Sequence, residues 1–589
     1  MSSNSASIFN ESLVTSLTPW KTVEEYCYFP DNFTFPAVCG SGVIFYGLDS
    51  SGFQAINCSL SAKYIPSNGL TADDLYVFHK RMHSNHLFYD DIGKYPLQQM
   101  PLGYMSFSIL IDGYRVAPAL LMEFASGWKR EIDLKSGLTK TSYSINRGIR
   151  LTIEHIIPMG STNPCFRLTA QSDDGKPHTV DFRFELKLRT RNGIHLWDDQ
   201  PAEIFADERG AVAAGARLYT GGTFEPAEDY TLGWGLWMKD GRHSITCDLK
   251  EYCLKDVEGN SPAVKLPPEG KKIRRLTLCA EKRLAVTADK ADFTEFCLHF
   301  GTGETGTADS GSVYKVLKYY AGRGFEDVLK ASCDFWEAFY SRIAAVSTGN
   351  DKYDFLYNKT MQLFATSMAL DSGAPPSFGY AAGSLWWHNS SFHDTMYMAR
   401  GLIQANAVNE TKALVGWLRD YCWQKEERPV YWLTRYDGYP ITKYLTENID
   451  NGFLALTSLT LVPVMFTEAT DRSSLNADGI YSMLRHSARY ASRHLLRKID
   501  GTYYCATSVV HDVSPGAFEK PSNQDATILL SLRPVFRKAY EYAVLMGVDE
   551  QERESWLEIA NNLYVPMDQE GYILFRDGGE RTGSFFIRL

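Results

Sequence analysis

The stretch Val180-Asp-Phe-Arg-Phe-Glu-Leu-Lys-Leu188 alternates an apolar with a polar residue at every step. Because successive side chains of a β-strand point to opposite faces, this pattern predicts a strand with one buried face and one solvated face. The same alternation occurs in Met105–Ile111 and, after the turn-forming Asn146-Arg-Gly148, in Ile149–Ile153. Many such strands between about residues 35 and 300 indicate a β-sandwich.

The periodicity changes after the polar, glycine-rich segment Gly301-Thr-Gly-Glu-Thr-Gly306. Apolar residues from Phe325 to Ile343 recur at spacings of three and four, which predicts an amphipathic helix that docks on the sandwich. Pro534 is expected to kink or restart the sixth of the helices that follow. These helices are predicted near residues 352–370, 391–405, 409–423, 449–468, 476–496, 523–546 and 550–562.

Strands followed by helices argue for separate β and α domains, so the chain is expected to be multidomain. We place a β-sandwich domain at residues 1–300, a linker with a helix at 301–345, and a helical domain at 346–589. A chain of 589 residues also exceeds what one hydrophobic core normally serves.

The charge and the cysteines bound the class of protein. A net charge of −10 gives no attraction for phosphate backbones or anionic lipid, so neither nucleic acid nor membrane is an expected partner. The first twenty residues contain no basic segment followed by an apolar run, and the eleven cysteines are scattered without CxxC pairs. These features predict a cytoplasmic protein with reduced thiols.

Three histidines, His79, His83 and His86, occur at helical spacing, which suits a shared metal ion. Surface or packing roles are the alternative that we favour, because no acidic second shell or cysteine partner is evident. We therefore expect neither a metal site nor a cofactor.

Several short motifs follow one another along the chain. The first half contains Pro101-Leu-Gly103, Trp128-Lys-Arg-Glu-Ile-Asp-Leu134 with Gly137, and Phe166-Arg-Leu-Thr-Ala-Gln171. The second half contains Gly324-Phe-Glu, Trp336 and Phe392-His-Asp394-Thr395.

In this order the motifs resemble the six-hairpin glycosidase superfamily. The first set is similar to the N-domain of the 1,2-α-fucosidase family (glycoside hydrolase family 95), and the second to the maltose and kojibiose phosphorylase family (glycoside hydrolase family 65). The resemblance implies an N-terminal β-super-sandwich followed by an (α/α)6-type six-hairpin barrel. It also implies an inverting enzyme that cleaves glycosidic bonds of neutral oligosaccharides by hydrolysis or phosphorolysis.

The sequence ends at Leu589, soon after Tyr564–Gly571, a stretch that precedes the last hairpins in the family. The resemblance therefore implies a barrel that is incomplete at the C-terminus, through truncation or through a departure from the family's architecture. Helix faces left exposed in this way would favour homo-oligomers.

Inverting cleavage needs a protonated carboxylic acid at the leaving oxygen and, for hydrolysis, a carboxylate that activates water. The family's catalytic acid corresponds here to the segment Ser514-Pro-Gly-Ala-Phe-Glu519, where a small residue occupies the acid's position. Glu519 is our first candidate for the acid, with an ordinary loop glutamate as the alternative. Glu447 is the second candidate, although the residues beside it also suit helix capping. Asp512 is a third choice.

Asp394 has two interpretations. Ser391-x-x-Asp394 is a capping-box pattern at a helix start. The family likeness instead implies that Asp394 holds sugar hydroxyls, and Trp386, Trp387 and His388 immediately upstream could supply stacking and a hydrogen-bond donor. Arg435 is a further substrate-binding candidate. A catalytically inactive sugar-binding or scaffold protein with the same fold is the alternative to an enzyme.

Overall fold

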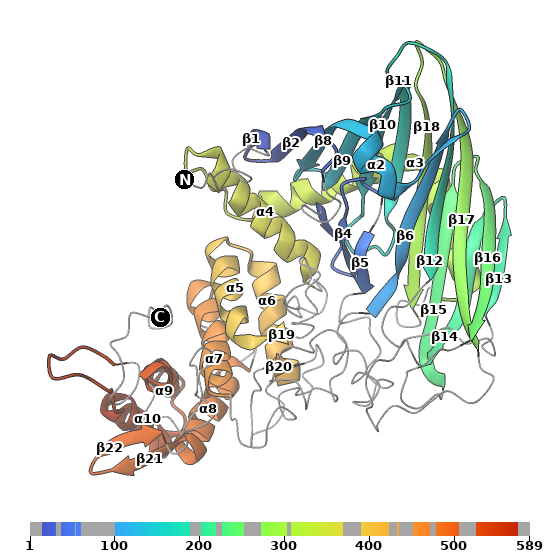
Figure 1. Ribbon diagram of the computed structural model, residues 1–589. Coiled ribbons are helices and arrows are strands. Elements are labelled where there is room, and N and C mark those ends of the chain that lie inside the picture. The colour runs from blue at the N-terminus through green and yellow to red at the C-terminus, as the bar shows by residue number, and fades with distance from the viewer. Residues whose placement is uncertain are drawn as a thin grey trace, which may run out of the picture. The chain divides into compact units, whose positions relative to one another are not determined.

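The computed structural model has two compact units; the described residues of the first run up to Met368, and those of the second begin at Ser390. The first contains two large antiparallel sheets, and the second is mainly helical (Figure 1). The predicted order of a β-region followed by a helical region is therefore confirmed. The described residues are 14–30, 37–53, 55–60, 100–188, 202–219, 226–251, 272–302, 308–368, 390–422, 433–434, 452–471, 479–505 and 526–574.

One sheet of the first unit has ten strands and the other has eight, and every strand pairs antiparallel with its neighbours. The ten-stranded sheet runs in the order β1 (Val14–Thr18), β2 (Lys21–Tyr28), β8 (Ala125–Asp133), β9 (Leu138–Ile145), β10 (Ile149–Ile156), β11 (Cys165–Ser172), β18 (Asp292–Thr302), β15 (Pro226–Met238), β14 (Gly210–Tyr219) and β13 (Glu203–Asp207). The eight-stranded sheet contains β16 (Arg242–Glu251), β17 (Lys272–Val286), β12 (His178–Leu188), β6 (Met100–Ile111), β5 (Ala55–Leu60), β4 (Ile44–Leu48) and β3 (Ala37–Gly40), with β7 (Tyr114–Val116) paired to β6.

The alternation that predicted β12 is the pattern of burial in the structure. Phe182 and Phe184 are buried, whereas the polar residues between them are partly exposed. On the other sheet, Phe166 and Phe296 contribute to the same core, with stacked rings whose centroids are 4.8 Å apart. Apolar faces of both sheets therefore form one hydrophobic core, as expected for a sandwich.

Strands begin earlier in the chain than the sequence pattern indicated. β1 and β2 lie before residue 35, at the edge of the ten-stranded sheet. Burial along β2 does not alternate from residue to residue. Because the prediction relied on period-two burial, a strand of this kind was missed.

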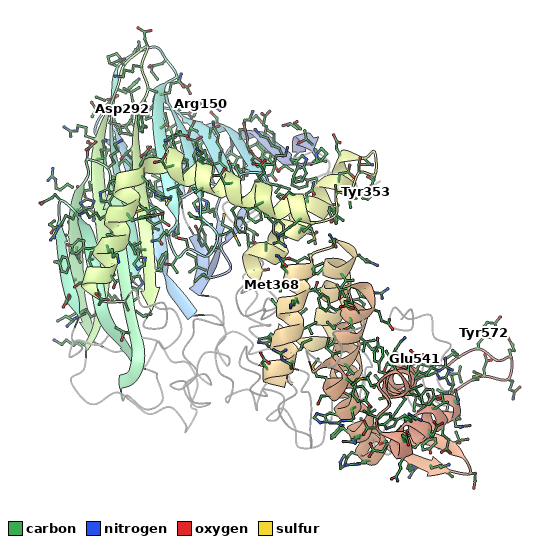
Figure 2. The ribbon with its side chains drawn as sticks, turned by 180° about the vertical axis from the view of Figure 1, so that it is seen from behind. Arg150, Asp292, Tyr353, Met368, Glu541 and Tyr572 are labelled. Carbon is green, nitrogen blue, oxygen red and sulfur yellow. The ribbon has the colours of Figure 1, made fainter. Side chains whose placement is uncertain are left out.

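Helix α3 (Ser310–Arg342) packs on strands of the ten-stranded sheet, and Figure 2 shows it crossing that sheet. It begins at Asp309, whose carboxylate accepts the backbone N–H of Ser312 at 2.9 Å, a side-chain N-cap. The helix thus starts before the predicted apolar run at Phe325.

Gly324 interrupts α3 with a φ of 74° and a ψ of 168°, so the helix is two segments joined at a kink. The backbone N–H of Phe325, which begins the second segment, donates to the Glu295 carboxylate at 3.3 Å. Arg167 bridges Glu295 and Glu326. A positive φ favours glycine, so the Gly324-Phe-Glu motif encodes the kink itself.

Helix α4 (Asp351–Ser367) also belongs to the first unit. Its Asn358 donates to the carbonyl of Pro19 at 2.8 Å, and the Gly42 N–H donates to the carbonyl of Thr366 at 2.7 Å. The compact β-unit therefore extends beyond residue 346, where the sequence placed the start of the helical domain. Helical periodicity shows where a helix begins and does not show which core the helix joins.

The second unit contains the remaining predicted helices in the predicted order. Pro534 lies inside α9, which continues past it as one helix, so the helix does not restart there; the kink, the other predicted outcome, stays a prediction. No helix among the described residues is both long enough and apolar enough to cross a bilayer. The helices are α5 (Phe392–Gln404), α6 (Val408–Trp417) with a π-helical turn at Leu418–Cys422, α7 (Gly452–Ala469), α8 (Ile480–Tyr490) with a π-helical turn at Ala491–Leu495, α9 (Ala526–Met546) and α10 (Glu550–Asn562).

These helices are arranged as hairpins. α5 packs beside α6, α7 beside α8, and α9 beside α10, and the first helices α5, α7 and α9 also pack on one another in succession (Figure 1). The six α-helices described in this unit are fewer than two for each of six hairpins. The arrangement is that of an α/α barrel of which the described residues form part.

Candidate functional site

Most of the predicted site residues lie outside the described residues. Asp394 is the exception, since it lies in the first turn of α5, where the structure describes the backbone. The residues outside are the catalytic candidates Glu519, Glu447 and Asp512, the binding candidates Trp386, Trp387, His388 and Arg435, and the histidines His79, His83 and His86.

A short β-ladder brings two of the predicted binding segments together. β19 (Ser390–Ser391) pairs antiparallel with β20 (Leu433–Thr434), with Ser390 opposite Thr434. β19 directly precedes α5, and Thr434 is bonded to Arg435. Consecutive Cα atoms are about 3.8 Å apart, so the start of the Asp394 helix and the attachment point of Arg435 are near neighbours despite their separation in sequence.

The other predicted residues precede first helices of hairpins. Trp386–His388 come before α5, Glu447 comes before α7, and Glu519 comes before α9. In an array of antiparallel hairpins, the first helices run in the same direction and their N-termini lie at the same end. That end also presents the unpaired N–H groups and the positive dipole ends of the helices, which suit hydroxyl and carboxylate groups.

The motif around Trp128 is structural. The indole Nε1 of Trp128 donates to the carbonyl of Ser50 at 2.7 Å. Arg130 is fully buried, and its guanidinium donates to the carbonyl of Asp49 and, at 3.2 Å, to the hydroxyl of Thr141. These bonds hold a turn of the sandwich. The residues of this motif therefore have a structural role, and this part of the family likeness concerns the fold.

A buried cysteine and histidine also have a packing role. The Tyr46 hydroxyl lies 2.6 Å from Nε2 of His155, and the Cys39 sulfur lies 3.7 Å from Nδ1. Burial lowers the pKa of His155 to about 3 and raises the pKa of Cys39 to about 11. Both groups are neutral near pH 7 and are buried, and the raised pKa of Cys39 leaves little of the thiolate that a nucleophile needs.

A polar groove of about 1090 Å³ lies on the first unit, formed by β12, β16, β17 and neighbouring turns. Charged side chains in it are paired across strands: Asp181 lies 2.6 Å from Arg283, and Arg183 lies 2.5 Å from Glu281. The sequence analysis did not predict this groove. Polar residues of Val180–Leu188 help to line the groove, but from the sequence we interpreted them only as the solvated face of a strand.

His243 lines the groove, but both nitrogens of its ring are already hydrogen-bonded. Its Nε2 accepts the backbone N–H of Met238, and its Nδ1 donates to the carbonyl of Asp207, each at 3.0 Å. Burial lowers the pKa of this imidazole, which favours the neutral form. Both ring nitrogens are engaged in holding turns, so His243 is not placed to act as a general base.

Among the described residues, no group of three or more His, Cys, Asp or Glu side chains is arranged to hold a metal ion. Several charged side chains around the groove are paired, including Asp181 with Arg283, Arg183 with Glu281 and Lys282 with Asp240. The catalytic candidates Glu447, Asp512 and Glu519 lie outside the described residues, so their place remains a prediction from the sequence.

Solved structures share this fold. A structure described as a kojibiose phosphorylase from the human microbiome matches with a TM-score of 0.63 and 12% identity, covering 96% of this chain and 72% of its own. A bacterial glucoamylase in complex with acarbose matches with a TM-score of 0.54 and 12% identity, covering 95% of this chain and 74% of its own. No protein-family model and no curated protein matches the sequence.

The chain therefore has the fold of six-hairpin glycosidase-type enzymes. This confirms, at the level of the fold, the resemblance inferred from the motifs. At 12% identity the likeness carries no assignment of individual residues.

Proposed function

We propose that this chain is a carbohydrate-active enzyme that cleaves glycosidic bonds of neutral oligosaccharides with inversion. The observation that supports the proposal is the order of the chain in a glycosidase-type fold: Asp394 lies in the first helix of one hairpin, and Glu447 and Glu519 precede in sequence the first helices of the next two. In this proposal Glu519 is the general acid and Asp394 holds hydroxyls of the sugar. Such a protein would work in the cytoplasm.

Two further observations support an oligosaccharide ligand. The β19–β20 ladder joins the Asp394 helix to the segment that leads to Arg435, so one polar site can draw on both. The glucoamylase that shares the fold is in complex with acarbose, an oligosaccharide inhibitor. Aromatic rings at Trp386 and Trp387 would stack on the apolar faces of sugar rings.

Glu447 is the proposed carboxylate for water activation if the acceptor is water. A phosphorylase would instead use phosphate as the nucleophile, and its product would be a sugar 1-phosphate. Turnover of α-linked glucose and fucose oligosaccharides, with and without phosphate, distinguishes these two reactions. Product anomers followed by NMR immediately after mixing test the inversion.

The decisive variant is Glu519→Gln, which keeps the shape of the side chain and removes its proton. Loss of a general acid should lower turnover by about a hundredfold or more while sugar binding persists. Glu554→Gln, a change at an exposed glutamate on α10, is the matched control and should keep full activity. Full activity in Glu519→Gln would transfer the acid role to Glu447 or Asp512.

A sugar-binding protein without catalysis is the second candidate function. The observation in its favour is Ala517, a small residue within the segment that carries the catalytic acid in the family. Calorimetric binding of an oligosaccharide without any glycan turnover would support this function and contradict the first.

A further inference from the structure

Cys165 and Cys297 lie opposite each other on neighbouring strands of the ten-stranded sheet. β11 and β18 pair antiparallel with these two residues in register. The backbone N–H of Leu298 donates to the carbonyl of Pro164 at 2.9 Å. Because this bond joins the residue after one cysteine to the residue before the other, the two cysteines occupy a non-hydrogen-bonded pair of the ladder.

This position in the ladder suits a covalent link. In a non-hydrogen-bonded pair the Cα atoms are about 4.5 Å apart, and both side chains point to the same face of the sheet. A disulfide requires Cα atoms about 4.4–6.8 Å apart and Cβ atoms about 3.5–4.5 Å apart. The two thiols can therefore be joined with little movement of the backbone.

The surroundings leave room for the sulfur atoms to approach. Cys165 and Cys297 are buried between the sheet and α3, in an apolar cluster that includes Phe325 and Val328. A cavity of about 10 Å³ borders both cysteines, close to the lower limit for one water molecule. Rotation of the thiols into this space avoids overpacking against α3.

We propose that Cys165 and Cys297 form a modification site, a dithiol that hydrogen peroxide oxidises to a cross-strand disulfide. One thiol attacks a peroxide oxygen, which breaks the O–O bond and yields a sulfenic acid and a water molecule. The second thiol then attacks the sulfenic sulfur, and the S–S bond forms as a second water leaves. The two sulfurs lose two electrons in total, and the hydrogen peroxide gains them. This site is independent of the proposed glycosidase activity.

The burial of the pair sets the rate and the consequence of this reaction. Burial raises the pKa of both thiols, so little thiolate is present at neutral pH. The exposed Cys27 and Cys247 should therefore react first, and the cross-link should follow more slowly. The disulfide would close a long loop of the chain and so stabilise the sandwich.

The test uses the whole folded chain and hydrogen peroxide as the oxidant. After a time course, free thiols are blocked with N-ethylmaleimide, and the digested protein is analysed by mass spectrometry without reduction. We expect a peptide containing Cys165 linked to one containing Cys297, lighter by two hydrogen atoms than the separate peptides and released by dithiothreitol. Oxidation should also raise the melting temperature of the wild-type chain.

Matched variants separate the cross-link from general oxidation. Cys165→Ala and Cys297→Ala should each lose the linked peptide and the rise in melting temperature, while Cys333→Ser should keep both. Absence of the linked peptide in the wild-type chain, once Cys27 and Cys247 are fully oxidised, would overturn the proposal. An equal yield of the linked peptide from urea-unfolded protein would overturn it as well, because the folded register would then play no part.

Discussion

Trp336 lies directly against Gly137, so closely that a Cβ atom on Gly137 would be 2.6 Å from the indole Nε1. Gly137 has a φ of 69° in the turn between β8 and β9, and Trp336 is buried on α3. In the same contact, the Ser332 hydroxyl donates to the carbonyl of Ser136 at 2.6 Å. Gly137 and Trp336, two motif residues far apart in sequence, thus pack against each other where α3 covers the sandwich.

Gly137→Ala should destabilise the chain through both backbone strain and a clash with Trp336. The positive φ costs an L-residue about 1–2 kcal/mol, and overpacking against the buried indole adds about 1–3 kcal/mol. Gly113→Ala is the matched control, because Gly113 has a φ of 83° with open space around its Cβ position. In urea unfolding, Gly137→Ala should lower the free energy of unfolding more than Gly113→Ala does. Equal losses in the two variants would mean that the Trp336 ring moves aside without an energetic penalty.

Arg130 provides a second stability test, since it is a fully buried cation in the sandwich. Arg130→Met removes the donor to the Asp49 carbonyl and the positive charge near Glu24, so unfolding free energy should fall by about 3 kcal/mol or more. Lys129→Met changes the neighbouring, partly exposed cation and should cost about 1 kcal/mol or less. Similar losses in urea unfolding of the two variants would contradict the role given to Arg130.

His178 predicts a pH dependence of stability at one end of the sandwich. Its Nδ1 lies 2.7 Å from Asp112 and its Nε2 lies 2.9 Å from Asp174, so the imidazolium donates to both carboxylates. These bonds raise the pKa of His178 above 6.5 and, with backbone donors, lower the pKa values of Asp112 and Asp174 below 3.8. The stabilisation from His178 is therefore complete below pH 6.5 and is lost as pH rises through the raised pKa.

The stabilisation from the two aspartates is lost only as pH falls through their lowered pKa values. We expect the melting temperature of the wild-type chain to fall relative to that of His178→Gln between about pH 6 and pH 9. Melting curves of both proteins across this range provide the measurement. A constant difference between the two proteins would show that His178 does not titrate in this window.

The sequence predicted those parts of the fold in which local pattern and tertiary burial coincide. Phe182 and Phe184 alternate with charged residues because one face of β12 enters the core, and α10 begins and ends where its periodicity predicts. The kink at Gly324 was not predicted, because the predicted helix began at Phe325 and the helical segment before Gly324 was missed. The pairing of Cys165 with Cys297 was not predicted either, because the register between two strands far apart in sequence cannot be recognised in the local pattern of either strand.

The candidate site was predicted from the sequence only as a set of separate segments. Three helix starts assemble because α5, α7 and α9 pack in succession, a tertiary relationship that no single motif contains. The contact between the start of α5 and the segment before Arg435 comes from the pairing of Ser390 with Thr434. This pairing joins two residues with no chemical signature of their own, so no motif in the sequence could indicate it.

Asp394→Asn distinguishes a sugar ligand from a helix cap, because the two roles affect different quantities. A capping carboxylate contributes about 0.5–2 kcal/mol to helix stability, and Asn is itself a good cap, so the melting temperature should change little in either case. A carboxylate that accepts hydrogen bonds from sugar hydroxyls contributes about 1.5–3 kcal/mol to binding. We expect calorimetry with a glucose-type or fucose-type oligosaccharide to show affinity reduced by more than about tenfold. Asp351→Asn, a change in the first turn of α4, is the matched control and should leave affinity unchanged. An unchanged dissociation constant in Asp394→Asn would leave Asp394 as a helix cap and remove the best-matched residue from the proposed site.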